Sequence, residues 1–596
     1  MRPQRLRLIL LFIFYIIIVH NAKAQNEIEA KPTITSDLTY MGTRGSPFNY
    51  DIIASGNPTT YNASNLPEGI TFDTNTGKFG GRFLVTGEYQ ITLSAANPSG
   101  SSSAVLSIEV VEDPFLPYLN SIPPVHEVIS EIEISENGKQ ITVKRFTFKS
   151  RNNANTVYAI MAAPKEAGTY PGLMYLHGGG SEAEGTYNYL KHFASLGYVT
   201  IGIDLPGLHG LDKAEYSTGP YRERGGGEGP RLDVAEGAGK SILVDAEVAA
   251  IEALNLLQSQ PNVDPNKLGV AGFSWGGYST TMIAGLLGDK VKAAYAVFGC
   301  GFYDKGSFWK NLISNMSTTD REIWLTYLDA GRRASNITGA YFIEAASNDT
   351  FFWPEAVENT LREVTAPKNH TWGPNKNHQQ VFSSRTMMEY HFGYYLKSEG
   401  NQFVSASVTQ AARKDDGSGI VDVELDISTS VSIRSVRLYY STTDNNWQER
   451  IWVPVTAQLL QDNKYRAELT TDIVSKNVDY YIYVTDSRNI VTSTYMHNTQ
   501  DFTSYTLSIR ETDIEEKVLI FPNPNSGKFY VKLNKSEKAV LTVIDANGKL
   551  VYSELMHPSE KTIQVNLNKK SAGVYYIKLI SDQVNLVKKL VITGLN

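Results

Sequence analysis

The sequence predicts a multidomain protein in which one α/β segment, with a mostly parallel doubly wound sheet, is flanked by all-β sandwich domains. Residues 113–398 alternate short apolar runs with helical patterns, an order typical of parallel strands joined by crossover helices. The segments 31–112, 401–510 and 517–596 instead show period-two alternation interrupted by turn residues. A chain of 596 residues is long enough for several separate cores.

Residues 1–24 have the pattern of a signal peptide. Arg2, Arg5 and Arg7 precede the apolar run 8–19, and Ala22-Lys23-Ala24 forms an A-x-A cleavage site. This run is too short to cross a bilayer as a helix, which needs about 20 residues. We therefore expect cleavage by signal peptidase and a mature protein outside the cytoplasm, without a transmembrane segment.

Residues 31–112 show the pattern of a β-sandwich. Apolar and polar residues alternate over 88–95, and turn residues occur at Asn57-Pro58 and at 98–100. The segment also resembles cadherin-like or immunoglobulin-like modules of bacterial surface proteins, at residues 66–73, 76–77 and 87–89. We expect a spacer role for this domain, with carbohydrate binding as the alternative.

The pentapeptide Gly272-Phe273-Ser274-Trp275-Gly276 fits the pattern G-x-S-x-G. An apolar run at 267–272 predicts a buried strand before it, and residues 277–287 predict a helix after it. A sharp turn between a strand and a helix exposes the serine hydroxyl above the sheet. A Cβ at either flanking glycine would clash in so tight a turn. Ser274 is therefore the predicted nucleophile.

A serine hydroxyl becomes a useful nucleophile when a base removes its proton, and a carboxylate must orient that base. Asp349 follows the apolar run 340–346, at the end of a strand where this kind of sheet carries its functional loops. His378 lies in a polar loop ahead of the helical segment 383–395. The predicted catalytic set is Ser274, Asp349 and His378.

Two residues compete for these roles. Glu344 is the alternative acid, but it lies inside the apolar run and is more typical of a buried structural group. His370 is the alternative base, and it lies in the proline-rich stretch 366–374. Asp349 could also be a turn-forming residue.

A glycine run after another apolar strand predicts the oxyanion hole. Residues 171–176 are followed by His177-Gly178-Gly179-Gly180. Glycines allow backbone N–H groups to point at a developing oxyanion, so Gly178, Gly179 and the N–H of Trp275 are the expected donors. Phosphate binding is the rival interpretation, but the sequence has no G-x-x-x-x-G-K-[ST] motif here.

With these motifs, residues 113–398 resemble an α/β-hydrolase of the dienelactone hydrolase, acetylxylan esterase and prolyl oligopeptidase group. The run Tyr198-to-Gly207 resembles the next strand and turn of those enzymes. Dienelactone hydrolases proper use a cysteine nucleophile, whereas this chain has Ser274. The resemblance therefore implies ester or amide hydrolysis through an acyl-serine. Members of the group act on very different substrates, so the fold does not select one.

Two long irregular segments within the α/β region, 205–240 and 301–338, are typical of lids or substrate walls. Arg222 and Arg224 are predicted to hold a carboxylate or sulfate. Trp309 and Trp353 are predicted to stack against sugar rings. The alternative is that these aromatic residues build the core of a helical cap.

Residues 401–510 are rich in alternating strands, as at 436–441 and 478–484, and resemble a fibronectin-III-like domain. We expect this domain to pack against the hydrolase segment. Residues 517–596 predict a small antiparallel sandwich with turns at Asn547-Gly548 and Ala572-Gly573.

The tail also resembles the C-terminal sorting domain of the type IX secretion system of Bacteroidetes, at residues 521–527, 543–551, 573–578 and 588–592. This resemblance implies export by the type IX machinery, with the tail removed and the enzyme released or attached to the cell surface. The alternative is an accessory β-domain without a sorting role.

The composition excludes several classes. A net charge of −7 without long charged runs argues against a nucleic-acid partner. The single cysteine, Cys300, excludes an internal disulfide and is expected to be a packed strand-end residue. We expect no cofactor and no metal.

Three hypotheses follow. The first is a secreted serine esterase that removes acetyl or other acyl groups from a plant or algal polysaccharide, with a lipid or polyester esterase as a variant. The second is a serine peptidase of prolyl-oligopeptidase type, although the N-terminal region is too short for the β-propeller of those enzymes. The third is a surface adhesin with a relic hydrolase domain, which the intact catalytic set disfavours.

Overall fold

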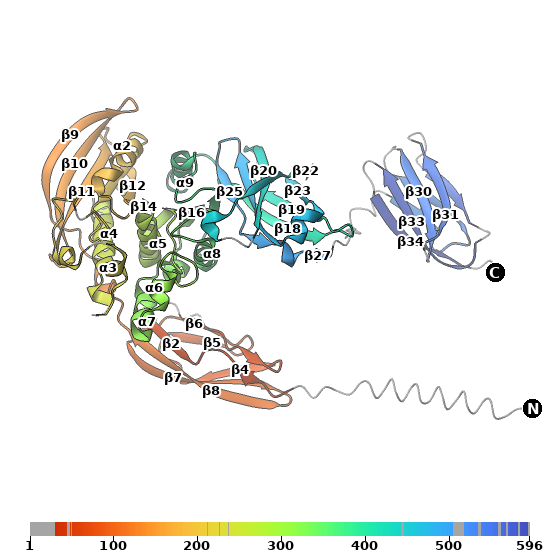
Figure 1. Ribbon diagram of the computed structural model, residues 1–596, viewed down its shortest axis with the longest axis horizontal. Helices are drawn as coiled ribbons and strands as arrows, with labels where there is room; N and C mark the ends of the chain where they lie inside the picture. The colour runs from red at the N-terminus through yellow and green to blue at the C-terminus, as the bar shows by residue number, and fades with distance from the viewer. Residues whose placement is uncertain are drawn as a thin grey trace, which may run out of the picture. The chain divides into compact units, whose positions relative to one another are not determined.

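The computed structural model describes residues 30–43, 48, 50–210, 212–225, 227–235, 238–428, 430–442, 446–504, 518–533, 538–546, 548–557, 562–567, 570–581 and 585–593. The chain divides into two compact units, Met1–Thr503 and Ser504–Asn596. The predicted signal peptide, residues 1–24, lies outside the described residues. Figure 1 labels the helices and strands.

The first part of the larger unit is all-β. Its main sheet has the order β2-β8-β7-β4. Two separate strand pairs, β1-β3 and β5-β6, make up the rest of this part. The strands are β1 (Thr33–Ile34), β2 (Thr39–Thr43), β3 (Ala54–Ser55), β4 (Thr60–Ser64), β5 (Ile70–Asp73), β6 (Lys78–Gly81), β7 (Gly87–Asn97) and β8 (Gly100–Val111). Alternate residues of β7 are buried, among them Ile91, Leu93 and Ala95. This alternation is the pattern from which the sequence predicted a sandwich.

The α/β part is built on one nine-stranded sheet with the order β17-β16-β15-β14-β12-β13-β11-β10-β9. The pairings from β13 through β12 to β17 are parallel, whereas β9, β10 and β11 pair antiparallel. The strands are β9 (His126–Glu136), β10 (Lys139–Ser150), β11 (Asn155–Pro164), β12 (Tyr170–Leu176), β13 (Val199–Ile203), β14 (Val263–Phe273), β15 (Val291–Val297), β16 (Ala340–Ala346) and β17 (Lys368–Gly373).

Helices cover both faces of this sheet (Figure 1). On one face α2 (Tyr187–Ser195) and α9 (Ser384–Lys397) meet through the rings of Phe193 and Phe392, 6.1 Å apart. On the other face α4 (Ile242–Gln258) packs beside α5 (Trp275–Leu287). Because both faces are covered, every residue of β13 and of β16 is buried. These strands therefore appear in the sequence as continuous apolar runs.

Shorter helices lie in the inserts and connections. They are α3 (Glu228–Leu232), α6 (Lys310–Ser314), α7 (Thr318–Tyr327) and α8 (Pro354–Glu363), with the 3₁₀ segments η1 (Leu116–Tyr118), η2 (Ala183–Thr186), η3 (Pro220–Arg224), η4 (Ala238–Lys240), η5 (Gly288–Lys290) and η6 (Ala330–Asn336). The two long segments that the sequence marked as irregular thus contain short helices. No helix among the described residues is long and apolar enough to cross a membrane.

Residues 401–503 form two facing sheets, β22-β23-β19-β18-β27 and β21-β20-β24-β25, and β26 also pairs with β24. Trp452, Tyr481 and Ile490 of this part belong to the same apolar core as the nine-stranded sheet. The elements are β18 (Ser405–Arg413), β19 (Gly419–Asp426), β20 (Ile433–Thr442), η7 (Trp447–Glu449), β21 (Val453–Thr456), β22 (Gln458–Gln461), β23 (Lys464–Leu469), α10 (Thr471–Ser475), β24 (Val478–Asp486), β25 (Val491–Ser493), β26 (His497–Asn498), η8 (Thr499–Asp501) and β27 (Thr503–Ser504). The two parts are therefore packed together, as the sequence led us to expect.

The smaller unit has two antiparallel sheets, β28-β29-β32 and β31-β30-β33-β34, around its own apolar core. Its strands are β28 (Val518–Phe521), β29 (Lys528–Leu533), β30 (Ala539–Asp545), β31 (Leu550–Met556), β32 (Thr562–Asn566), β33 (Gly573–Ser581) and β34 (Asn585–Ile592). Burial alternates along β29 and β32, as in a two-layer sandwich.

Candidate active site

Ser274 lies on a strained turn between β14 and α5. Its backbone is left-handed, with φ 56° and ψ −118°, a conformation that costs free energy in a residue other than glycine. A Cβ on Gly272 would lie 2.3 Å from the Gly276 carbonyl oxygen, and one on Gly276 would lie 2.2 Å from the Leu176 carbonyl oxygen. Neither distance can hold a side chain, so the turn needs both glycines of the G-x-S-x-G pattern.

The three predicted catalytic side chains are joined in one hydrogen-bonded chain. His378 Nε2 lies 3.0 Å from Ser274 Oγ, and His378 Nδ1 lies 3.0 Å from Asp349 Oδ2. A carboxylate can accept but not donate, so Nδ1 carries the hydrogen and Nε2 is free to accept the serine proton. The three residues follow β14, β16 and β17, at the carboxyl edge of the sheet.

Asp349 is held in place by backbone hydrogen bonds in addition to its bond to His378. Asp349 is completely buried, and its Oδ1 accepts the backbone N–H groups of Phe351 at 2.7 Å and Phe352 at 3.1 Å. Its Oδ1 also lies 3.2 Å from His378 Nδ1. These bonds fix the carboxylate plane toward the imidazole. Asp349 thus makes the backbone contacts of a turn-forming residue and also bonds His378, and its role as the catalytic acid stays a prediction.

Four aromatic rings surround the imidazole of His378. Their centroids lie 4.7 to 5.9 Å from the imidazole centroid, for Phe298, Phe351, Phe273 and Phe352. Such packing restricts the ring to one orientation, while one fifth of the His378 side chain remains exposed. His378 is therefore positioned by contacts on several sides and still open to solvent.

The two competing residues have structural positions. Glu344 is fully buried and accepts hydrogen bonds from Ser384 Oγ at 2.5 Å, the Val381 N–H at 2.7 Å and Tyr295 Oη at 2.9 Å. Burial raises the pKa of Glu344 to about 7. His370 is buried, and its Nε2 bonds the Thr494 carbonyl oxygen at 3.1 Å. Neither bonds Ser274 or His378 among the described contacts.

The glycine turn after β12 runs alongside the nucleophile. A Cβ on Gly178 would lie 3.4 Å from Ser274 Cβ, and one on Gly179 would lie 2.7 Å from Trp275 Cδ1. The first helical hydrogen bond of α5 runs from the Tyr278 N–H to the Ser274 carbonyl, so the Trp275 N–H has no acceptor within the helix. Gly178, Gly179 and Trp275 therefore lie next to Ser274, at the N-terminal end of α5 with its positive partial charge, and their role as oxyanion donors stays a prediction.

A neutral histidine holds the glycine turn. His177 Nε2 accepts the Leu205 N–H at 2.9 Å, so its other nitrogen, Nδ1, donates to the Gly178 carbonyl at 2.7 Å. Burial lowers the pKa of His177 to about 4. The turn is therefore held by the same tautomer at neutral pH, and His177 has a structural role.

The predicted anion-binding arginines differ in position. Arg222 donates from Nε to the Ser217 carbonyl at 2.8 Å and from Nη2 to the Ala214 carbonyl at 2.6 Å. These bonds close a turn of the insert and give Arg222 a structural role, and its predicted role in holding a substrate anion stays a prediction. Arg224 lies at the exposed end of η3, and its role as a substrate contact stays a prediction.

The two predicted tryptophan platforms also differ. Trp309 is 1% exposed and packs between Trp275, at 5.0 Å, and Phe351, at 6.0 Å. No face of Trp309 is left for a sugar ring, and the alternative, that insert aromatics build a small core, describes it better. Trp353 is half-buried, bonds the Thr350 carbonyl from Nε1 at 3.1 Å and stays a predicted contact.

The sequence did not single out a buried charge beside the glycine turn. Arg231 on α3 is 7% exposed, with its guanidinium over the Trp275 ring at 5.3 Å and Nη1 at 3.6 Å from a Cβ built on Gly179. Glu228 pairs with it at 2.7 Å and also accepts from the indole N–H of Trp309. The helix α3 has five residues, and no motif or periodicity marks these two.

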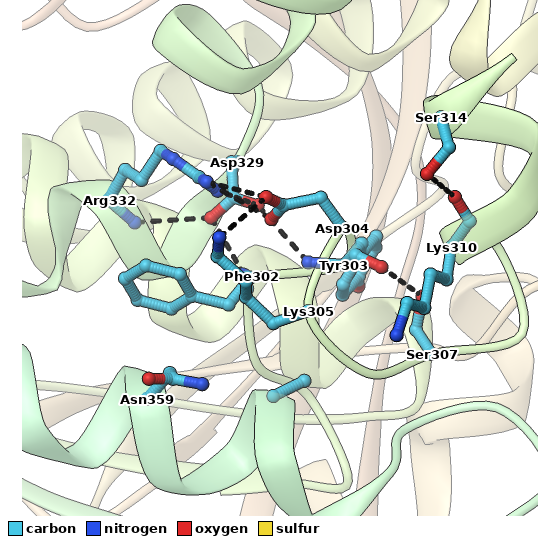
Figure 2. Close-up of polar contacts among 12 residues, drawn as sticks. Phe302, Tyr303, Asp304, Lys305, Ser307, Lys310, Ser314, Asp329, Arg332 and Asn359 are labelled. Atoms are coloured by element: carbon cyan, nitrogen blue, oxygen red, sulfur yellow. Dashed lines mark hydrogen bonds and ion pairs between the residues drawn. The ribbon is translucent and has the colours of Figure 1, made fainter.

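An ion-pair cluster fastens the segment that leaves β15. Figure 2 shows the guanidinium of Arg332 paired with the carboxylates of both Asp304 and Asp329, and the ion-pair distances are 3.0 and 2.9 Å. Asp329 is fully buried and also accepts the Phe302 N–H at 2.8 Å. The cluster joins the segment that follows β15 to the start of η6. We assign it a supporting role.

Comparison with known proteins gives three family matches. Residues 125–392 match the family described as acetyl xylan esterase (AXE1), and residues 31–111 match an Ig domain family. Residues 519–593 match the secretion system C-terminal sorting domain. The first match lies in the α/β part, the second in the N-terminal all-β part and the third in the smaller unit.

One curated relative is an acetyl esterase of Xylanibacter ruminicola, 25% identical over 240 residues. The match covers 38% of this chain and 53% of the esterase, so the chain spans about half the length of this relative. Among solved structures, acetyl xylan esterase 1 from Thermoanaerobacterium sp. aligns with TM-score 0.39 and 17% identity, over 47% of this chain and 91% of that one. An acetyl xylan esterase from Paenibacillus sp. aligns with TM-score 0.38 and 20% identity, over 47% and 92%.

Proposed function

We propose that this protein is a secreted serine esterase that removes acetyl or other acyl groups from a polysaccharide, with residues 113–398 as its catalytic domain. The observation that carries the proposal is the hydrogen-bonded chain from Ser274 through His378 to Asp349. This chain lies within the segment that matches the acetyl xylan esterase family. The hydrogen-bonded chain supports a serine nucleophile that is activated by a histidine. The family match supports an ester as the bond that is cleaved.

In the acylation step, His378 Nε2 takes the proton of Ser274 as Oγ attacks the ester carbonyl. The carbonyl oxygen becomes an oxyanion, and the bond to the alcohol oxygen then breaks. His378 returns the proton to the departing alcohol, which leaves the acyl group on Ser274. Asp349 keeps the imidazole in the productive tautomer and stabilises its charged form.

In the deacylation step, a water molecule replaces the alcohol. His378 takes a proton from the water, whose oxygen attacks the acyl carbonyl and forms a second oxyanion. The bond from the carbonyl carbon to Oγ breaks, and His378 returns the proton to Ser274. Backbone N–H groups at Gly178, Gly179 and Trp275 are the proposed oxyanion donors, and one such donor is typically worth about 3–4 kcal/mol in the transition state.

Two exposed aromatic residues favour a carbohydrate substrate. Phe382, four residues after His378, is fully exposed, and Phe308 is 48% exposed against Phe351. Phe351 itself contacts the imidazole at 5.0 Å. Sugar rings present apolar faces that pack on such side chains. Trp353 and Arg224 are the other proposed substrate contacts.

The tail supports export. A secretion system C-terminal sorting domain is the family matched by residues 519–593. We take the type IX machinery as the partner of this unit and the outside of the cell as the place of action. An esterase exported in this way meets polymers that do not enter cells.

Acetate release from a panel of acetylated polysaccharides, measured for the wild type and Ser274→Ala, tests the proposal. Release by the wild type with none from Ser274→Ala would support it and would rank the substrates. Retention of most of the activity in Ser274→Ala would reject the nucleophile. Hydrolysis of p-nitrophenyl acetate without release from any polymer would redirect the search to lipids, polyesters and proline-containing peptides.

A further inference from the structure

The loop that carries the acid is bonded to the β-sandwich of residues 401–503. Asn348, directly before Asp349, is 5% exposed and donates from Nδ2 to the Arg450 carbonyl at 2.6 Å. Its Oδ1 accepts from Ser347 Oγ at 2.7 Å. Both ends of this buried amide are therefore occupied, and one of them joins the acid loop to the neighbouring domain.

The loop that carries the base makes a second bond to the same domain. Asn375, three residues before His378, donates from Nδ2 to the Trp452 carbonyl at 2.9 Å. Its Oδ1 accepts the Trp452 N–H at 2.7 Å. This pair of bonds imitates the pairing of two strands, so the side chain fixes both the distance and the direction of the base loop.

The partner segment, residues 447–452, is itself anchored. Arg450 pairs with Asp479 at 2.6 Å, and its guanidinium lies 3.6 Å from the ring centroid of Trp447. Trp452 is buried in the core that both domains share. A carbonyl or N–H on this segment is therefore a fixed point for the two asparagines.

The acid and base loops are also bonded to each other. The Asn348 N–H donates to the Lys376 carbonyl at 3.0 Å. Asn377 Oδ1 accepts from both the N–H and the hydroxyl of Thr350, each at 2.9 Å. The two loops thus form one hydrogen-bonded body, and segment 447–452 holds it from outside the α/β part.

We propose that the domain of residues 401–503 is a working part of the catalytic centre, with Asn348 and Asn375 as positioning residues for Asp349 and His378. Loops beyond strand ends are the most mobile parts of such a fold. Catalytic groups must stay within about 0.5 Å of the productive geometry, which loops rarely achieve without support. Segment 447–452 supplies that support. This inference rests on the catalytic roles proposed above.

The test compares three variants of the full chain: Asn348→Ala, Asn375→Gly and the control Asn369→Ala. Glycine is used at Asn375 because φ is 57° there, a conformation that alanine would strain. Asn369 also bonds the same domain, because its Nδ2 donates to the Val404 carbonyl at 2.9 Å. It lies on β17, however, away from the loops that carry Asp349 and His378. The control therefore removes the same kind of contact without touching the acid or the base.

Three measurements are made on each variant: kcat and KM for p-nitrophenyl acetate, the rate of Ser274 labelling by a fluorophosphonate, and Tm. In the labelling reaction the bond from Oγ to phosphorus forms, fluoride leaves and His378 takes the proton. We expect Asn348→Ala and Asn375→Gly to lose roughly 10- to 100-fold in kcat and in labelling, with KM changed less than about threefold, because misplacement by 1 Å has effects of that size. Asn369→Ala should keep both rates, even where its Tm falls as far.

Wild-type labelling and turnover in both test variants would overturn the inference, and so would an equal loss of rate in Asn369→Ala. Should Asn348→Ala fail to fold, Asn375→Gly decides, because Asn375 lies at the exposed rim of the contact. Failure of the proposed function gives a different pattern. The wild type would then label but hydrolyse no ester, and the labelling rates would still compare the variants.

Discussion

Replacing Asp349 with asparagine is expected to place His378 in the wrong tautomer. Oδ1 of Asp349 accepts two backbone N–H groups, from Phe351 and Phe352, so the amide oxygen of asparagine must take that position. The amide NH₂ then occupies the Oδ2 position, 3.0 Å from His378 Nδ1. An NH₂ group can only donate, so Nδ1 becomes the acceptor and the hydrogen moves to Nε2. In that form the imidazole cannot accept the proton of Ser274.

The size of the loss follows from this geometry. The base is present and correctly placed but has the wrong tautomer, and an equivalent change in a serine protease lowers kcat by about 10⁴. That factor corresponds to about 5.5 kcal/mol in the activation free energy. Asparagine has the shape of aspartate and keeps both backbone bonds, so the fold should survive. Activity should not fall to zero, because the oxyanion donors remain.

The assay is kcat and KM for p-nitrophenyl acetate, with the fluorophosphonate labelling rate as a second readout and Tm as the control for folding. We expect kcat to fall by about 10⁴ with a small change in KM, and labelling to fall in parallel. A rate within tenfold of the wild type would refute the reasoning. A larger loss in Glu344→Gln than in Asp349→Asn would transfer the role of the acid to Glu344.

Three further changes test other parts of the site. Arg231→Met keeps the packing on Trp275 but removes a charge beside the glycine turn at Gly178 and Gly179. A charge there is worth about 1–2 kcal/mol, so kcat for p-nitrophenyl acetate should fall roughly tenfold. Lys292→Gln, which changes an exposed residue near the amino end of β15, serves as the control in the same assay. Phe382→Ala should raise KM for an acetylated polysaccharide about fivefold, since an aromatic contact is worth about 1 kcal/mol, and should leave p-nitrophenyl acetate kinetics unchanged. Burial raises the pKa of Glu247 from 4.5 to about 8, so its contribution to stability is complete below the unfolded value and is lost as pH rises through about 8. Glu247→Gln should therefore reduce the difference in Tm between about pH 5 and about pH 8 in calorimetry, and an undiminished difference would contradict the assignment.

The strained turn around Ser274, the proposed nucleophile, could be predicted because its cause is local. The clashes that exclude a side chain at Gly272 and Gly276 arise within the turn itself or with the adjacent strand. The positions of Asp349 and His378 could also be predicted, although the two residues are far from Ser274 in the sequence. A parallel sheet brings the carboxyl ends of its strands to one edge, so residues just beyond those ends meet whatever their separation in sequence.

The residues of the inserts could not be predicted because their roles depend on how each insert folds. Arg222 and Arg231 lie nine positions apart in one glycine-rich segment, and composition does not distinguish them. The structure directs Arg222 to the carbonyls of its own turn and Arg231 to the Trp275 ring. Trp309 likewise has a side chain of the type that stacks on sugar rings, but neighbouring residues bury it.

The contact between the catalytic loops and the β-sandwich of residues 401–503 is even harder to predict from the sequence. Asn348 and Arg450 are 102 residues apart, and the contact uses the carbonyl of Arg450 rather than its side chain. Every residue has a carbonyl, so a substitution at position 450 could preserve the bond while erasing any pattern that points to it. What identifies such a contact is the amide on the other side, a buried asparagine next to a catalytic acid. A buried amide must bond something, and here the nearest fixed acceptor belongs to another domain.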